Sequence, residues 1–261
     1  VSIGSVLPLE TRCTTINKVC GSSLKAVMIA ATEIRAGVSK IVVSGGMESM
    51  SNAPFFVRNP KKGDDVSFAS LESVMMQDGL IDAYSGESMG NTGETVSEEF
   101  DISRQVSDEF SVRSHFLANK AWDEGWLDNE VFRVGELSRD EGIRPDTNME
   151  ALSVLKAVFK EKGLVTAGNA SQVSDGASAV LIASEDAAKE NNMPIIARII
   201  DYATSGVDPG RVMSAPIPAV NMLLEKTRMN IEDIVILEHN EAFASASCAI
   251  SIGTFGRTMP L

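Results

Sequence analysis

The sequence predicts an α/β fold, because helical and strand patterns alternate along the chain and one polar, helical stretch interrupts them. Residues 22–37 and 41–43 give a helix, a tight turn and a buried strand in succession, which is typical of α/β proteins. A similar succession begins at residue 177. Residues 51 to about 165 are instead richer in charge, Asp, Met and aromatic side chains, which indicates a subdomain inserted into one α/β layer.

The first helix and strand are recognised by their boundaries. Residues 22–37 carry apolar side chains at helical spacing and end on Gly37, a typical helix C-cap. The β-branched run at 41–43 ends at a double glycine, which predicts a buried strand that runs into a turn. Within the inserted stretch, residues 103–124 have the pattern of an amphipathic helix.

The second part of the chain repeats this alternation. Residues 177–183 predict another buried strand, and Ser184 is expected to cap a short helix with acidic residues in its first turn. Residues 195–202 and 234–237 are the third and fourth strand candidates, and residues 216–228 form an amphipathic helix between them.

The composition is that of a globular protein and excludes several classes of function. The chain has 261 residues, a length that allows one large domain or two small ones. Hydrophobic residues make up 44% of it and charged residues 23%, as in an ordinary globular protein. A formal charge of −13 argues against nucleic-acid binding, because neutralising phosphates requires a basic face. No run of about 18 apolar residues and no signal-peptide pattern occurs, so we expect neither a membrane span nor secretion.

Cysteine and histidine are too scarce for a disulfide framework or a multi-histidine metal site. The three cysteines, Cys13, Cys20 and Cys248, lie at unrelated spacings, and no CxxC pair offers zinc ligands. His115 and His239 are the two histidines. We therefore expect no bound metal and a reducing, cytoplasmic location.

Cys20 is the first candidate for chemistry, at a Cys-Gly-Ser turn that follows a short apolar strand and opens the helix at 22–37. Unpaired N–H groups and the positive end of the helix dipole would stabilise a thiolate there. Gly21 would let a ligand approach the backbone, and the Cys20 N–H could face a developing oxyanion. A buried structural cysteine is the alternative, and the pattern alone does not choose between them.

Asn240 and Glu241 are the second candidates, because they follow the predicted strand at 234–237. The carboxyl ends of strands are where α/β folds bind ligands. A helix cap is the alternative and the more common role for such a pair. His239 could act as a base, but its side chain should point away from Asn240, so we expect it behind the site or on the surface.

Residues 165–178 are the third candidate segment. They are rich in Gly and Ser and run into the strand at 177–183, so their backbone could surround a polar ligand. Loops of this composition are abundant, and Asp175-Gly176 is an ordinary turn signal. The segment is therefore weak support for function when taken alone.

Several segments together resemble the thiolase family. These are TINKVCGSSLKAV, SGGMESMSN, TAGNASQVSDGAS and NEAFA, in this order, with GESMGNTGETV and DEGIRPDTNMEAL in addition. No one of them is specific, whereas the set, spread over residues 9–250, is highly specific.

The resemblance implies a fold and a reaction. The fold is a thiolase-like layered α-β-α-β-α arrangement of two similar halves with an inserted loop domain. The reaction is acyl transfer between a cysteine and coenzyme A, either formation of acetoacetyl-CoA or thiolysis of 3-ketoacyl-CoA, by a ping-pong mechanism. Coenzyme A would be a substrate, with no cofactor bound permanently. Acetyl-CoA and 3-ketoacyl-CoA would be the partners, and family members form homodimers or homotetramers.

The resemblance also implies domain boundaries. We expect the N-terminal thiolase half at residues 1–50 and 166–184, with the inserted loop domain at 51–165. Residues 185–250 would form the first part of the C-terminal thiolase half. Residues 251–261 resemble a segment found near the N-terminus of family members.

By the same resemblance, individual residues receive roles. Cys20 matches the acyl-accepting nucleophile, and Asn240 matches the residue that holds an oxyanion-hole water. The residues matched to binding are Arg144 for the nucleotide part of coenzyme A, Ala170 and Ser171 beside the pantetheine, and Met89 and Phe243 in the acyl and pantetheine pocket.

The sequence departs from the family pattern in two respects. Ser88 stands where many members have a histidine before the methionine, which leaves the acyl chain length open. The GGAxxxGHPxGxSG and CxGGG segments, which supply a histidine and a second cysteine in the family, do not occur in this sequence. Cys248 follows NEAFA directly and lacks the glycines, so we expect it to be a core cysteine.

The arrangement of segments predicts that parts of a longer thiolase are missing or out of order. We expect breaks in the chain near Pro8/Leu9 and Ile250/Ser251, and a pocket at Cys20 that lacks one wall. A catalytically defective protein of thiolase fold that binds coenzyme A or acyl-CoA is the main alternative. Ketoacyl synthases share the cysteine turn but not NEAFA, and a purely structural α/β domain would not explain the set of motifs.

Overall fold

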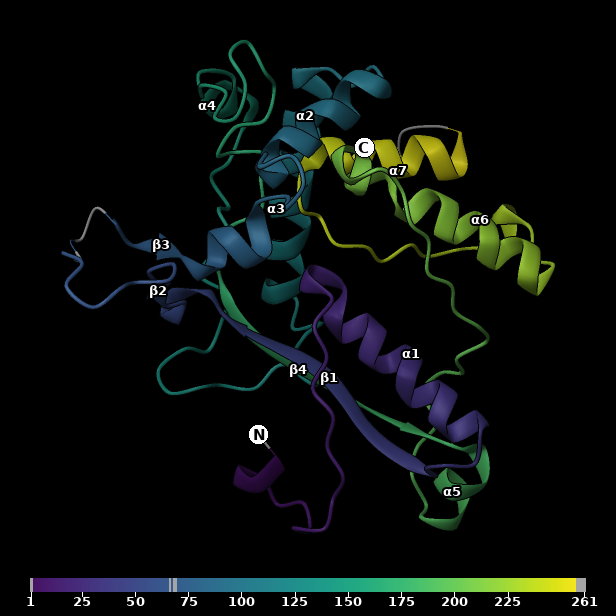
Figure 1. Cartoon of the computed structure of the whole chain (residues 1–261). Helices are drawn as coiled ribbons and strands as arrows, with labels where there is room; N and C mark the ends of the chain where they lie inside the picture. Colours follow the sequence, from purple (N-terminus) through teal and green to yellow (C-terminus); the bar gives the residue numbers. More distant parts are fainter. Residues whose placement is uncertain (1, 66, 68–69, 257–261) are drawn as a thin grey trace. The chain divides into compact units, whose positions relative to one another are not determined.

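The computed structural model describes residues 2–65, 67 and 70–256, and the chain divides into two compact units (Figure 1). Unit 1 comprises Val1–Ser49 and Asp175–Ile199, and unit 2 comprises Met50–Ser174 and Ile200–Leu261. Each unit thus joins segments that are far apart in the sequence.

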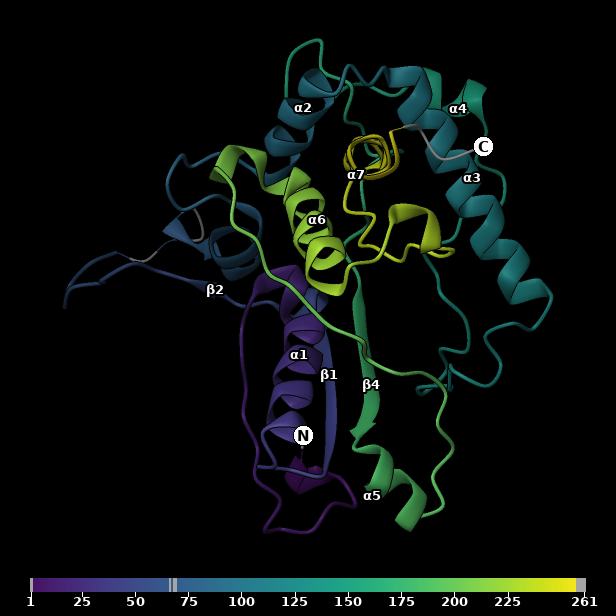
Figure 2. The same cartoon turned by 90° about the vertical axis from the view of Figure 1, so that its right-hand side faces the viewer.

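Unit 1 is built on a two-stranded antiparallel sheet of β1 (Ile41–Ser49) and β4 (Asp175–Ala183). Helix α1 (Ser22–Arg35) lies along this sheet (Figure 2), and α5 (Glu185–Glu190) follows β4. The predicted helix at 22–37 and the predicted strands at 41–43 and 177–183 are confirmed as elements. The expectation that these strands are buried is wrong, because most of their side chains are exposed or half-exposed on a sheet of only two strands. The turn expected at the double glycine is also wrong, since β1 continues through it to Ser49.

Glycines allow the close packing of unit 1. A Cβ atom added to Gly46 would lie 2.4 Å from Oγ of Ser23, so the missing side chain lets α1 approach β1. A Cβ atom on Gly45 would lie 2.0 Å from the carbonyl oxygen of Ser178 in the neighbouring strand. The cap on α5 is also as predicted, because the Ser184 side chain accepts a hydrogen bond from the amide of Ala187 at 3.2 Å.

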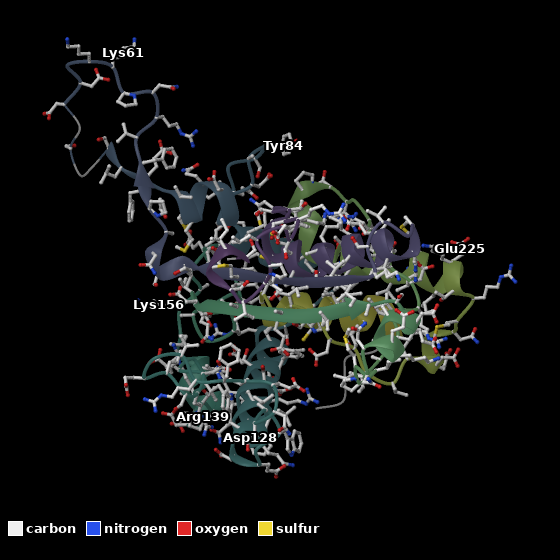
Figure 3. The ribbon with its side chains drawn as sticks, turned by 90° about the horizontal axis from the view of Figure 1, so that it is seen from below. Lys61, Tyr84, Asp128, Arg139, Lys156 and Glu225 are labelled. Carbon is white, nitrogen blue, oxygen red and sulfur yellow. The ribbon has the colours of Figure 1, made fainter. Side chains whose placement is uncertain are left out.

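Unit 2 is mainly helical. Its helices and strands are β2 (Phe55–Phe56), β3 (Glu72–Ser73), α2 (Met89–Glu99), α3 (Arg104–Asp123), α4 (Met149–Ser153), α6 (Pro216–Thr227) and α7 (Ala244–Phe255). The two short strands pair with each other, and Lys61 lies at the far end of the loop that joins them (Figure 3). Short helical turns complete the chain at Ser2–Gly4, Val19–Gly21, Met50–Asn52, Met76–Leu80, Pro209–Ser214 and Ile231–Asp233.

The core of unit 2 lies where α2, α3 and α7 meet. Val96, Ile102, Cys248 and Ala249 form one buried cluster there. The predicted helices at 103–124 and 216–228 are confirmed, and Ser103 caps α3 by accepting from an amide in its first turn.

Two predicted strands are wrong. The described chain has no strand at 195–202 or at 234–237, and Ile196 and Val235 are 95% and 92% exposed. The β-branched runs favour an extended backbone, but a strand also needs a ladder partner and a half-buried surface. For the same reason the short strand expected before Cys20 is absent, since residues 11–18 have no regular structure.

The two predicted chain breaks are also wrong. Helix α7 passes through Ile250 and Ser251, both of which are buried. A turn spans the other junction, because the amide of Thr11 donates to the carbonyl of Pro8 at 3.0 Å. Of the segment 251–261, residues 251–255 form the end of α7, and residues 257–261 lie outside the described part of the chain. The domain boundaries given above stay a prediction.

Candidate functional site

Cys20 lies in a tight turn of unit 1, Val19–Gly21, that leads directly into α1. Its side chain is exposed. Val19, the residue before it, has φ +47°. A β-branched residue in this left-handed region is a genuine outlier, and such strain is commonly found at functional sites.

Two neighbouring side chains hold this strained turn. Oδ1 of Asn17 accepts from the Val19 amide at 2.8 Å. The Ser22 hydroxyl donates to the Val19 carbonyl at 2.7 Å and accepts from the Lys18 amide at 2.8 Å. Asn17 and Ser22 were not singled out in the sequence, although both lie in the motif around Cys20. Their hydrogen bonds offset part of the backbone strain and fix where the thiol emerges.

The other cysteines have different surroundings. Cys13 is exposed, and its thiol donates to the Thr11 carbonyl at 3.3 Å. Cys248 is buried in the core of unit 2, as expected, and burial raises the pKa of its thiol to about 11. The Cys248 thiol therefore stays protonated at neutral pH, whereas Cys13 offers an exposed thiol for comparison with Cys20.

In unit 2, the segments TAGNAS and NEAFA lie side by side. Ala170 and Phe243 form an antiparallel bridge. On either side of it, the Ser171 amide donates to the Ala242 carbonyl at 2.9 Å, and the Ala244 amide donates to the Asn169 carbonyl at 2.9 Å. Three of the predicted binding residues, Ala170, Ser171 and Phe243, are thereby placed on one short pair of segments.

Phe243 anchors this pair in the interior. Its side chain, 8% exposed, belongs to a buried cluster with Val165 and Ala246, and Met89 and Ala170 pack against that cluster. The Phe159 ring meets Phe243 edge-on, with ring centroids 6.2 Å apart. The predicted pocket residues Met89 and Phe243 therefore share one apolar cluster.

Asn240 precedes this pair, and its side chain is exposed. The following residue, Glu241, accepts a hydrogen bond from the Ser114 hydroxyl on α3 at 2.6 Å. Nδ1 of His239 lies 3.2 Å from the carbonyl oxygen of Asn240. A role for Asn240 in holding a water stays a prediction.

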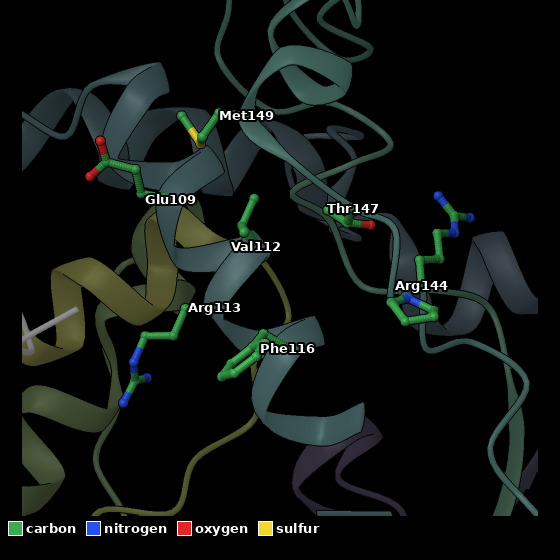
Figure 4. A pocket seen from close by; sticks show the side chains of 8 residues that line it. Glu109, Val112, Arg113, Phe116, Arg144, Thr147 and Met149 are labelled. Carbon is green, nitrogen blue, oxygen red and sulfur yellow. The ribbon is translucent and has the colours of Figure 1, made fainter. Parts of the chain in front are cut away.

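Arg144 borders a cavity of about 370 Å³ between α3 and the segment 144–149. Val112 and Phe116 contribute apolar surface, and Arg113 lies across the cavity from Arg144 with its guanidinium group pointing away (Figure 4). The cavity thus combines an apolar lining with charged side chains of both signs, Glu109, Arg113 and Arg144, at its margin. Its lining residues are Glu109, Val112, Arg113, Phe116, Arg144, Pro145, Thr147 and Met149.

His115 supports this region and was missed in the sequence. Its Nδ1 accepts a hydrogen bond from the Arg144 amide at 3.2 Å. Burial lowers the pKa of His115, and the positive charge of Arg144 lowers it further, while Glu241 and Asp146 oppose the shift. Ser114 and His115 are consecutive residues on a helix whose sequence shows only general amphipathicity, so no motif marks them.

The described part of the chain offers neither a cluster of metal ligands nor a membrane-spanning helix. Among the described residues, no group of three or more His, Cys, Asp or Glu side chains is arranged to hold a metal ion. Within the same part of the chain, no helix is long and apolar enough to cross a membrane.

Comparison with known proteins relates both parts of the chain to one family. The family model "Thiolase, N-terminal domain" matches residues 1–186, and "Thiolase, C-terminal domain" matches residues 193–253. A "Probable acetyl-CoA acyltransferase" of Staphylococcus aureus (strain COL) is 40% identical over 253 residues, which cover 94% of this chain and 64% of the relative. The chain thus spans slightly less than two thirds of the length of this relative.

Solved thiolase structures have the same fold. Human mitochondrial 3-ketoacyl-CoA thiolase in complex with CoA superposes with a TM-score of 0.89 at 37% identity, covering 96% of this chain and 64% of that one. Acat5 thiolase from Ascaris suum in complex with coenzyme A superposes with a TM-score of 0.89 at 35% identity. The match covers 97% of this chain and 67% of the Acat5 chain. These matches confirm the predicted thiolase-like α/β fold, and with the family models they show that the chain belongs to the thiolase family.

Proposed function

We propose that the chain carries out acyl transfer between Cys20 and coenzyme A, as part of acetoacetyl-CoA formation or 3-ketoacyl-CoA thiolysis. The observation that carries the proposal is the exposed thiol of Cys20, presented from a strained turn at the start of α1. A strained turn that leads into a helix is a known way to expose a nucleophile. Membership of the thiolase family supports the assignment of its substrate class.

In the proposed first half-reaction, the Cys20 thiolate attacks the thioester carbonyl carbon of the acyl-CoA. A bond forms between this carbon and Sγ of Cys20, and the bond to the sulfur of coenzyme A breaks. Coenzyme A leaves as a thiolate and takes up a proton. Backbone N–H groups at the start of a helix are suited to stabilise the oxyanion in between. In the second half-reaction of acetoacetyl-CoA formation, the enolate of a second acetyl-CoA attacks the acyl carbon, a carbon–carbon bond forms, and Cys20 leaves as a thiolate. In thiolysis the thiolate instead attacks the 3-keto carbon, the carbon–carbon bond breaks, and acetyl-CoA leaves after its α-carbon takes up a proton. The thiolate of free coenzyme A then takes the acyl group from Cys20.

The binding residues proposed for coenzyme A are those of unit 2. Ala170 and Ser171 would border the pantetheine, and Met89 and Phe243 would line the acyl and pantetheine pocket. Support comes from the pairing of the Ala170 and Phe243 segments and from the apolar cluster that Met89 joins. Asn240 would hold a water that faces the reacting carbonyl.

Arg144 is proposed to meet the nucleotide part of coenzyme A. A guanidinium group is well suited to phosphate oxygens, and the cavity that Arg144 borders has apolar surface at Val112 and Phe116 for a planar base. Coenzyme A would act as a substrate rather than as a resident cofactor.

The proposal also includes a cytoplasmic location and assembly into a homodimer or homotetramer. Scarce cysteines support a cytoplasmic location, and the habit of the family supports a homodimer or homotetramer. The alternative, a defective protein that only binds acyl-CoA, is not favoured by relatives described as acyltransferases and thiolases.

Trapping the acyl-enzyme tests the proposal. The chain is incubated with acetyl-CoA, quenched in acid and mapped by peptide mass spectrometry, while free coenzyme A is measured. We expect an acetyl group on Cys20, released coenzyme A in equal amount, and a loss of transfer by several orders of magnitude in Cys20→Ser.

Cys13 provides the matched control, because its thiol is exposed as well. Cys13→Ser should be acetylated at Cys20 as fast as the wild-type chain. Equal acetylation of Cys13 and Cys20 would indicate non-enzymatic transfer and contradict the proposal. A chain that binds coenzyme A without acetylation would favour the defective alternative.

A further inference from the structure

Asp108 is a buried carboxylate on α3 to which the proposed acyl transfer gives no role. Its side chain is 2% exposed, and Oδ2 accepts a hydrogen bond from Nε of Arg104, one helical turn earlier, at 2.7 Å. Arg104 also donates to the Leu152 carbonyl, which holds its guanidinium group in place. Burying a charged pair costs free energy unless the atoms left over also form hydrogen bonds. The second carboxylate oxygen of Asp108, Oδ1, therefore needs a hydrogen-bond donor.

That donor is Asn169, which lies 61 positions later in the chain. Its Nδ2 donates to Oδ1 of Asp108 at 2.9 Å. Because an ionised carboxylate only accepts hydrogen bonds, it dictates which end of the Asn169 amide faces it. Oδ1 of Asn169 then accepts from the Thr166 amide at 2.8 Å, and the second Nδ2 proton goes to the Leu164 carbonyl at 2.9 Å.

The start of the same segment rests on a second buried carboxylate. Glu94 on α2, 3% exposed, accepts from the amides of Leu164 and Val165 at 3.0 and 2.8 Å. Residues 164–169 are therefore fixed at both ends by side chains from other elements. Ala170 and Ser171, the proposed neighbours of pantetheine, continue directly from this fixed stretch.

We propose that Asp108 is a positioning residue for coenzyme A. By setting the orientation of the Asn169 amide, it fixes the backbone that presents Ala170 and Ser171 to the pantetheine. Asp108 itself is buried and acts through Asn169. This inference rests on the proposed function, because it needs coenzyme A as the ligand. A residue with only a structural role would change stability without changing the affinity of the folded chain for pantetheine in particular.

Calorimetric titration of the full chain with two probes separates these roles. The probes are coenzyme A and its nucleotide half, 3′-phosphoadenosine 5′-diphosphate, which lacks pantetheine. We expect Asp108→Asn, which keeps an acceptor oxygen of similar size, to raise the Kd for coenzyme A by roughly threefold to tenfold. Asp108→Ala should raise it by more than about tenfold. The Kd for the nucleotide half should stay unchanged in both variants. If Asp108→Ala does not fold, the comparison of the two Kd values in Asp108→Asn alone tests the proposal.

Two further variants sharpen the test. In an Asn169→Ala background, Asp108→Asn should have no additional effect on the affinity for coenzyme A, because the amide through which it acts is gone. Asp123→Asn is the matched control on the same helix. It breaks the ion pair with Arg139 and should leave both affinities at their wild-type values, because the hydrogen bonds of Asp123 are with Asn119 and Arg139.

The possible outcomes are distinguishable. Unchanged affinity for coenzyme A in both Asp108 variants overturns the inference and leaves the proposed function intact. An equal loss for both probes, together with a lower unfolding temperature, assigns Asp108 to stability alone and also overturns it. A wild-type chain that binds neither probe contradicts the proposed function itself.

Discussion

The turn that carries Cys20 and the paired segments that carry Ala170 and Phe243 are held by different kinds of contact. The turn is exposed and strained, and the hydrogen bonds that hold it come from Asn17 and Ser22, within a few positions of Cys20. The paired segments are fixed by buried groups from distant parts of the chain. The comparison shows that an exposed thiol can be positioned by its immediate neighbours, whereas the paired segments depend on long-range packing.

The largest effect should come from removing the anchor of the paired segments. Phe243→Ala deletes a buried ring and should lower the free energy of unfolding by about 3–5 kcal/mol. Urea denaturation followed by circular dichroism measures this. Phe55, 61% exposed in β2, gives the matched control, and Phe55→Ala should change stability by less than about 0.5 kcal/mol. Similar losses in both variants would show that the burial of Phe243 does not anchor the segments.

A smaller effect is expected from loosening the turn. Ser22→Ala removes both hydrogen bonds of the hydroxyl and lets Val19 relax from its strained conformation. The Cys20 thiol should then lose its position at the helix terminus, and its rate of alkylation by iodoacetamide should fall by about twofold to fivefold.

The same molecule supplies the reference for this measurement, since the alkylation rate of Cys13 should not change. Ser22→Thr keeps a hydroxyl group and should restore most of the rate at Cys20. A Ser22→Ala variant with the wild-type ratio of Cys20 to Cys13 labelling would mean that the turn does not depend on local hydrogen bonds.

The smallest effect concerns pH and the support of Arg144. Burial and the charge of Arg144 lower the pKa of His115 in the folded chain, so folding favours the neutral ring. The resulting stability is fully present above the unfolded pKa of about 6.5 and is lost as the pH falls through the lowered folded value. Urea denaturation near pH 8 and near pH 5 should show a greater loss of stability on acidification in the wild-type chain than in His115→Gln. An equal loss in both chains would exclude His115 as a source of the pH dependence.

The sequence predicts local structure better than long-range contacts. The helices at 22–37, 103–124 and 216–228 are confirmed because their caps and periodicity lie within the segments themselves. The strands expected at 195–202 and 234–237 are wrong, because strand formation depends on a neighbouring strand that periodicity does not reveal.

The same limit applies to the candidate site. The Cys20 turn is recognisable because its determinants are consecutive in the sequence. Asp108, in contrast, looks like any acidic residue on an amphipathic helix. Only the fold shows that it is buried and faces Asn169. Ser114 and His115 were missed for the same reason, since their partners Glu241 and Arg144 come from other segments.

The contact between Gly46 and Ser23 has a consequence for how this family can vary. A Cβ atom on Gly46 would collide with the Ser23 side chain, so the two positions share one small volume between α1 and β1. A larger residue at one position requires a smaller residue at the other, or a shift of the helix that carries Cys20 at its start. Homologous sequences should therefore show correlated substitutions at these two positions. The summed volume of the two side chains should stay nearly constant, so that a larger residue at one position accompanies a smaller residue at the other.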